Sequence, residues 1–131
     1  ERLDITKLAH TAESFDAVLC SHVLEHVVDD RQAMREIFRV LKTDGWALLL
    51  VPITAERTFE DPAVVSPAER LRVFGQADHV RRYGPDFAER LREAGFAVRI
   101  VRVAELHSSD EIARMGLSPA NRELYFCTKG G

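Results

Sequence analysis

The chain has 131 residues, of which 46% are hydrophobic, so it is long and apolar enough to form one domain with its own core. Its 18 basic and 21 acidic residues give a net charge of -3, which provides no electrostatic reason to expect a nucleic acid or an anionic membrane surface as a partner. The longest apolar run, Trp46 to Ile53, is far shorter than the roughly 20 residues that span a bilayer, so no membrane segment is expected.

Residues 14–51 predict a strand, a helix and a second strand, after a connector over residues 1–13. The first strand, Phe15 to Cys20, is mostly apolar, as a strand covered on both faces would be. The second, Trp46 to Val51, is a continuous apolar run typical of a central parallel strand. Two parallel strands joined through a helix form a right-handed crossover, which predicts an α/β sheet.

The helix between these strands has start and stop signals. Asp29 is expected to cap it, with Gln32 as the return partner of a capping box, and Gly45 is expected to end it in a left-handed turn. The residues at helical spacing that form its apolar face are Ala33, Met34, Ile37, Phe38, Val40 and Leu41. The charged residues expected to face water are Arg31, Arg35, Glu36 and Arg39.

The hydrophobic periodicity fades over residues 52–84, which predict a long excursion with a short helix near Pro67 to Phe74. Long segments of this kind in compact domains usually cover or bind ligands. A second helix is expected over Pro85 to Ala94, with Gly95 as its stop.

Two further strands are predicted near the end of the chain. Phe96 to Val103 alternates as a strand, residues 105–121 are irregular, and Glu123 to Thr128 forms the last strand. Cys20 and Cys127 each lie in an apolar strand, so two buried free thiols are expected rather than a disulfide. No signal peptide is visible, and the cytoplasm is the expected location.

Several segments match a known family in both order and spacing. They are FDAV at 15–18, LEH at 24–26, RVLKTDG at 39–45, LREAGF at 91–96 and ELYF at 123–126. Together they resemble the second half of class I S-adenosylmethionine-dependent methyltransferases, in the type 11 branch that acts on small molecules. The resemblance implies methyl transfer from S-adenosylmethionine to a small-molecule acceptor that the sequence does not identify.

The resemblance also implies a fold, because the family sheet has the order 3-2-1-4-5-7-6 with strand 7 antiparallel. The four predicted strands would then be strands 4, 5, 6 and 7 of a Rossmann-like sheet, with residues 1–13 as the tail of strand 3 and its connector. Residues 85–131 would form a helix and a terminal β-hairpin. Strands 1 and 2 and the glycine-rich loop would be lacking, so the chain is not expected to be competent alone.

The resemblance places cofactor contacts at two points. Asp4, with Ile5, matches the acidic residue after strand 3 that accepts a hydrogen bond from the adenine amino group; a capping role for Asp4 is the alternative. Ser21 and His22 follow the first predicted strand at the switch point where open α/β sheets bind ligands. There the family turn lines the methionine part of the cofactor.

Glu25 and His26 open the next segment, and the sequence leaves three roles open for them: support of the turn, acid–base or substrate contact, and metal binding. Some relatives hold a metal with a Glu-x-x-Glu-His pattern, but His22 replaces its first residue here, and we expect no metal. Our candidate assignment takes His26 as catalytic and Glu25 as a substrate contact.

Three residues at the end of the excursion complete the candidate site. His79 is the second catalytic candidate, because its pKa lies near neutrality, and Arg81 and Tyr83 are candidate contacts to the substrate. The alternative is that this segment is held only by its own side chains.

A second hypothesis is non-catalytic. The edge of the strand Phe15 to Cys20 would pair with another chain, either a second copy or a missing N-terminal half, and the domain would fold only in that way. An oxidoreductase with a Rossmann sheet is a weaker hypothesis, because an antiparallel last strand favours methyltransferases.

Overall fold

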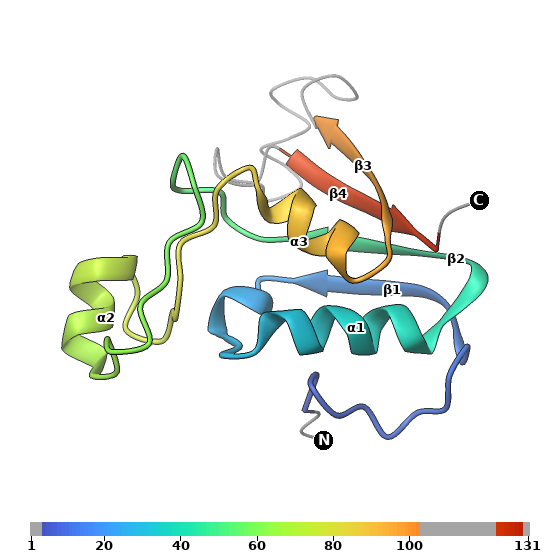
Figure 1. Cartoon of the computed structure of the whole chain (residues 1–131), viewed down its shortest axis with the longest axis horizontal. Helices are drawn as coiled ribbons and strands as arrows, with labels where there is room; N and C mark the ends of the chain where they lie inside the picture. Colours follow the sequence, from blue (N-terminus) through green and yellow to red (C-terminus); the bar gives the residue numbers. More distant parts are fainter. Residues whose placement is uncertain (1–3, 103–122, 130–131) are drawn as a thin grey trace, which may run out of the picture.

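The structure is a computed structural model that describes residues 4–102 and 123–129. Four strands form one sheet in the order β1-β2-β4-β3 (Figure 1). β1 (Phe15–Ser21) is parallel to β2 (Leu41–Leu50), whereas β4 (Glu123–Thr128) is antiparallel to both β2 and β3 (Ala97–Arg102). The α/β fold is confirmed, and the spatial order of the four predicted strands agrees with the expectation.

Two helices, α1 (Asp30–Val40) and α3 (Phe87–Glu93), contact each other and pack on one face of the sheet (Figure 1). Their apolar residues form a single core with the side chains that the strands turn toward them. The core includes Met34, Ile37, Phe87, Leu91, Cys20, Leu49, Tyr125 and Cys127. This core fixes the carboxyl ends of the parallel strands relative to the helices that follow them.

The start of α1 is confirmed, because the Asp29 carboxylate accepts a hydrogen bond from the Gln32 backbone N–H at 3.1 Å. The prediction for Gly45 was wrong. The chain passes straight from α1 into β2 through an extended Leu41, and Gly45 is not among the glycines with positive φ. Glycine is required there for space, since a Cβ would lie 2.7 Å from the Asp16 carbonyl oxygen.

Two charged residues of α1 that were expected to face water instead hold the N-terminal connector. Arg39 donates to the carbonyl oxygens of Leu8 and His10, and Glu36 accepts from the Leu8 N–H at 2.9 Å. The hydrogen bond from Arg39 also lowers the pKa of Glu36. Their side chains therefore fix the path of the connector alongside α1.

The excursion contains α2 (Pro67–Phe74) at the predicted position, and Figure 1 shows this helix well away from the sheet. The Ser66 hydroxyl caps α2 by accepting from the Glu69 N–H at 3.2 Å. The two arms of the excursion run together through β-bridges between Ile53 and Tyr83 and between Phe59 and Arg82.

Helix α3 is two residues shorter at its start than predicted, and Gly95, at φ +114°, ends it as expected. β4 has the predicted bounds, and β3 lies within the predicted range. Val103 and the irregular stretch over 105–121 lie outside the described residues.

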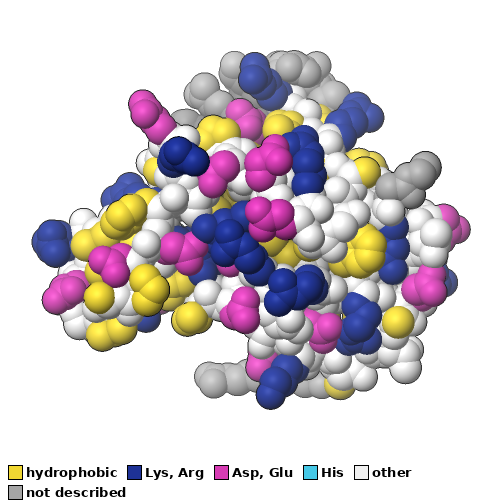
Figure 2. All heavy atoms as spheres, in the orientation of Figure 1, with side chains coloured by type: hydrophobic (Ala, Val, Ile, Leu, Met, Phe, Trp, Pro, Cys, Tyr) yellow, Lys and Arg dark blue, Asp and Glu magenta, His cyan; other side chains and the backbone are white. Residues whose placement is uncertain are grey.

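Both cysteines are free and buried, as predicted. Burial raises the pKa of Cys20 and of Cys127 to about 12, so both thiols stay protonated at neutral pH. Figure 2 shows basic and acidic side chains interspersed over the face in view. Across residues 4–102 and 123–129, no helix combines the length and the apolar character needed to cross a membrane.

Candidate active site

The turn after β1 begins with a backbone conformation that is unusual for its residue type. His22 has φ +56°, in the left-handed region, and its N–H donates to the Leu50 carbonyl oxygen at 3.0 Å. Non-glycine residues in this region are uncommon and gather at functional sites, where surrounding contacts hold them. The bond to Leu50 ties the turn to the end of β2, so both parallel strands end at this point.

The short helix η1 (Leu24–His26) carries a buried carboxylate. Glu25 is 2% exposed, and its Oε2 lies 3.6 Å from Nδ1 of His22. Its other oxygen, Oε1, has no hydrogen-bond partner among the described residues. A buried oxygen without a partner is rare in folded proteins, which marks Glu25 as a functional candidate.

His26 and His79 meet beside Glu25. The ring centroids of the two histidines are 4.6 Å apart, and the His26 Nδ1 lies 3.1 Å from the Asp78 carbonyl oxygen. Burial lowers the pKa of His79, and the neighbouring His26 lowers it further, so His79 is neutral at pH 7. The excursion is joined to η1 here by a 2.9 Å hydrogen bond from the Val80 N–H to the Glu25 carbonyl oxygen.

A cavity of about 200 Å³ opens between η1 and the excursion. Four predicted site residues line it together: Glu25, His79, Arg81 and Tyr83. Its other lining residues are Pro52, Thr54, Phe74, Gly75, Gln76 and Arg82. The structure therefore brings the end of β1 and the end of the excursion to one space.

Arg81 is buried and makes three hydrogen bonds with backbone carbonyl groups. Its guanidinium donates to the carbonyl oxygens of Leu24, Val27 and Val28 at 2.5–2.8 Å. The Tyr83 hydroxyl donates to the Asp30 carboxylate at 2.5 Å, and burial raises the pKa of Tyr83. Contact of Arg81 or Tyr83 with a substrate stays a prediction. The two terminal nitrogens of Arg81 and the Tyr83 hydroxyl have protein partners, whereas the buried Arg81 Nε has no hydrogen-bond partner among the described residues.

Sequence reasoning missed an ionic cluster beneath this cavity. Asp30, 2% exposed, accepts from Arg90 at 2.7 Å and lies 3.6 Å from Arg81, and Arg90 also contacts Glu60. In the sequence, Asp30 resembles any acidic residue in the first turn of a helix, where a negative charge interacts favourably with the helix dipole. Nothing local in the sequence indicates that two arginines and a tyrosine converge on it.

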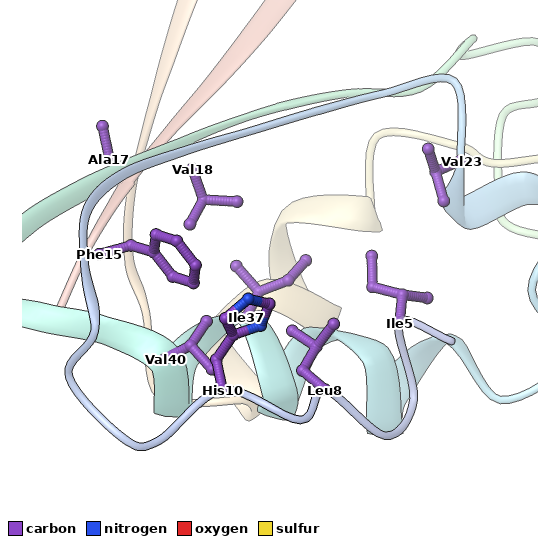
Figure 3. A pocket seen from close by; sticks show the side chains of 9 residues that line it. All are labelled: Ile5, Leu8, His10, Phe15, Ala17, Val18, Val23, Ile37 and Val40. Atoms are coloured by element: carbon purple, nitrogen blue, oxygen red, sulfur yellow. The ribbon is translucent and has the colours of Figure 1, made fainter. Parts of the chain in front are cut away.

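Asp4 and Ile5 lie on the far side of the turn, next to a second cavity. The Asp4 carboxylate is exposed and accepts from the Thr6 N–H and hydroxyl, which lower its pKa. Ile5 lines an apolar cavity of about 390 Å³ (Figure 3). The other residues around it are Leu8, His10, Phe15, Ala17, Val18, Val23, Ile37 and Val40. Because Val23 belongs to the turn after β1, that turn contributes to both cavities.

The fold agrees with the architecture that the sequence motifs predicted. A Rossmann-like methyltransferase domain is expected to have two parallel strands joined through a helix, and β1 and β2 form such a pair. It is also expected to have an antiparallel strand between its last two parallel positions, which is β4 between β2 and β3, and a polar turn after β1. Residues 1–49 match the family model described as a methyltransferase domain, Methyltransf_11. A curated relative, the "Uncharacterized methyltransferase YcgJ" of Bacillus subtilis (strain 168), is 36% identical over 69 residues.

Solved structures have a similar fold. The structure of YcgJ superposes with a TM-score of 0.57 at 24% identity, over 97% of this chain and 65% of that one. An S-adenosylmethionine-dependent methyltransferase from Mesorhizobium loti gives 0.61 at 18% identity, over 97% and 67%. The 1,6-didemethyltoxoflavin-N1-methyltransferase of Burkholderia thailandensis, solved with its substrate and S-adenosylhomocysteine, gives 0.61 at 19%, over 98% and 49%.

Over residues 1–49 the chain is thus similar to a methyltransferase domain, and its fold is that of solved methyltransferase structures, in agreement with the resemblance that its motifs indicate. The match to the curated relative covers 53% of this chain and 26% of YcgJ. The chain thus spans only part of that relative's length.

Proposed function

We propose that this chain forms the acceptor-side part of a domain that transfers a methyl group from S-adenosylmethionine to a small molecule. One observation carries the proposal: His22, with φ +56°, directly follows the carboxyl end of β1, and the nearby residues Val23 and Glu25 line the apolar cavity and the polar cavity, respectively. Open α/β sheets bind their ligands at this position. In family terms, β1, β2, β3 and β4 would be strands 4, 5, 6 and 7.

The described residues could contact the adenine portion of the cofactor but offer few partners for its ribose and methionine portions. The cavity beside Ile5 offers an apolar wall to an adenine ring, and Asp4 stands next to it. Among the described residues that line this cavity, His10 alone has a polar side chain, whereas the ribose hydroxyls and the methionine carboxylate need several polar partners. We therefore propose that other residues complete the cofactor site and that these 131 residues are not competent alone.

The roles proposed for the polar cavity follow from burial and charge. His79, neutral at pH 7, can take a proton from a hydroxyl or amine of the methyl acceptor. The His26 ring packs edge-on against the His79 ring and positions it. Glu25 faces the same cavity as a candidate substrate contact. Arg81 and Tyr83 act as positioning residues, because their bonds join the excursion to η1 and to α1.

Calorimetric titration with S-adenosylhomocysteine tests the proposal on the native protein, including any residues that precede this sequence. We expect saturable binding that Ser21→Ala weakens about 2- to 10-fold, the equivalent of one hydrogen bond. Ser14→Ala is the matched control, since Ser14 directly precedes the opposite end of β1 and its hydroxyl bonds only to Thr11 among the described residues. Equal affinities for Ser21→Ala and the unaltered protein would contradict the proposal.

One observation favours the second candidate, a half-domain that pairs through its sheet edge. Leu19 is 69% exposed although it lies on β1, which forms one edge of the described sheet. An exposed apolar residue on an edge strand invites pairing with another strand.

If this second candidate holds, sedimentation of the 131-residue chain will show a dimer that Leu19→Lys converts to a monomer. Lysine is expected to act in this way because a charge on an edge strand opposes pairing. Val28→Lys is the control, because Val28 is 76% exposed but lies outside the sheet. A monomer at all concentrations for the unaltered chain would count against edge pairing.

A further inference from the structure

We infer that Glu25, His26 and His79 form a binding site for a divalent transition-metal ion of the zinc class. One donor atom from each residue lies within 4.8 Å of the other two. The sequence predicts no metal here, because His22 replaces the first residue of the Glu-x-x-Glu-His pattern, and the pattern does not include His79. The inference does not rest on methyl transfer, since an ion can bind whether or not the chain binds S-adenosylmethionine.

The first argument is the buried Glu25 carboxylate. Its Oε1 has no hydrogen-bond partner among the described residues, while His22 stands 3.6 Å from Oε2. A carboxylate removed from water needs a partner for each oxygen, and a cation is the partner that best compensates its charge. Glu25 lines the polar cavity, so a small ion can reach it.

The second argument is the hydrogen bond at the back of His26. A carbonyl oxygen can only accept, so the contact between Nδ1 and the Asp78 carbonyl oxygen at 3.1 Å requires Nδ1 to carry the proton. That leaves the lone pair on Nε2. Histidines that bind metals nearly always donate their other ring N–H to a carbonyl or carboxylate in this way. The Asp78 carboxylate lies close behind the same nitrogen, at 3.4 Å.

The ligand set indicates the kind of ion. Two imidazoles and one carboxylate suit zinc and its neighbours, and sites with three protein ligands keep a further position open. Ligand atoms about 2.0–2.1 Å from a tetrahedral zinc ion lie roughly 3.4 Å from one another, so donor atoms that now lie within 4.8 Å have to close by up to about 1.4 Å. His79 is only partly buried, and a rotation of its side chain can supply that closure.

Arg81 and Arg82 also line this cavity, and the charge of Arg81 is balanced by two carboxylates. Arg81, which lines the same cavity, lies 3.6 Å from Asp30 and 3.7 Å from Glu60. A bound ion would take the ring lone pair through which His79 could accept a proton. The two roles of His79 therefore exclude each other in any one molecule.

Titration of the chelator-treated native protein with Co²⁺, followed by visible absorption and then displacement with Zn²⁺, tests this site. We expect one ion per chain and a ligand-field spectrum of nitrogen and oxygen coordination that Zn²⁺ abolishes. His79→Asn and His26→Ala are each expected to weaken binding at least tenfold. Glu25→Gln preserves the shape of the side chain and should weaken binding by a similar factor.

His10→Ala is the matched control, because His10 lies in the apolar cavity away from the cluster. It should bind Co²⁺ as the unaltered protein does. Far-ultraviolet circular dichroism shows whether each variant is folded; His79, being partly exposed, is the least prone to unfold the chain when replaced. The inference is overturned if Co²⁺ gives no saturable spectrum, or if folded His79→Asn binds as tightly as His10→Ala.

Discussion

Replacing Arg81 with methionine is expected to lower the free energy of unfolding by about 3–5 kcal/mol, the usual cost of removing one partner from a buried ionic group. Arg81 is 1% exposed and supplies the hydrogen bonds to the carbonyl oxygens of Leu24, Val27 and Val28. Methionine fills similar space but donates nothing, so these carbonyl groups lose their donor and Asp30 loses one positive neighbour.

Urea unfolding followed by circular dichroism measures this effect. The matched control is Arg35→Met, since Arg35 is exposed and its side chain bonds only to Gln32 among the described residues. We expect the control to keep the unfolding midpoint almost unchanged. If both variants unfold at the same urea concentration, Arg81 does not hold η1 and the excursion together.

Replacing Phe87 with alanine is expected to cost about 3–5 kcal/mol of stability, because the ring is fully buried and leaves a cavity. Phe87 packs edge-on against Tyr83 at 4.7 Å and against Tyr125 at 4.9 Å between ring centroids. It therefore connects the end of the excursion to β4 through α3. The loss should loosen the polar cavity as well as the core.

Comparing the thermal unfolding temperatures of Phe87→Ala and Phe59→Ala shows whether the loss of stability comes from the buried position of Phe87 or from the loss of any aromatic ring. Phe59 is 49% exposed and its ring centroid lies 6.0 Å from that of Phe74, so its removal should change the unfolding temperature little. A larger drop for Phe59→Ala than for Phe87→Ala would show that the core is centred elsewhere.

Local sequence signals were sufficient for most of the secondary structure. The Asp29 cap of α1, the Pro67 start of α2 and the Gly95 stop each depend on residues a few positions apart, and each is confirmed. The return half of the predicted capping box was wrong, because the Gln32 side chain donates to the Thr6 carbonyl oxygen and accepts from Arg35 instead. The prediction for Gly45 failed because it rested on conformation alone. The close approach of Gly45 to Asp16, on the neighbouring strand, is a tertiary contact that no local pattern contains.

The candidate site was less accessible to sequence reasoning. Position at the end of a strand made Ser21 and His22 candidates, and the structure ends β1 at Ser21. The contact between His26 and His79 depends on how the excursion folds back, which periodicity does not encode. Arg81 was predicted as a substrate contact because it lies beside His79 and Tyr83 at the end of the excursion, and in the structure its guanidinium donates to backbone carbonyl groups and lies near Asp30.

Photolabelling tests the central claim, that the turn after β1 forms a wall of a methyl-transfer site. The native protein is irradiated with S-adenosylmethionine carrying a labelled methyl group, digested with trypsin and analysed by mass spectrometry. Cleavage after Lys7 and Arg31 releases residues 8–31, which contain the whole turn. We predict label in this peptide that excess S-adenosylhomocysteine abolishes. Label confined to other peptides, or label that the competitor does not displace, would contradict the account.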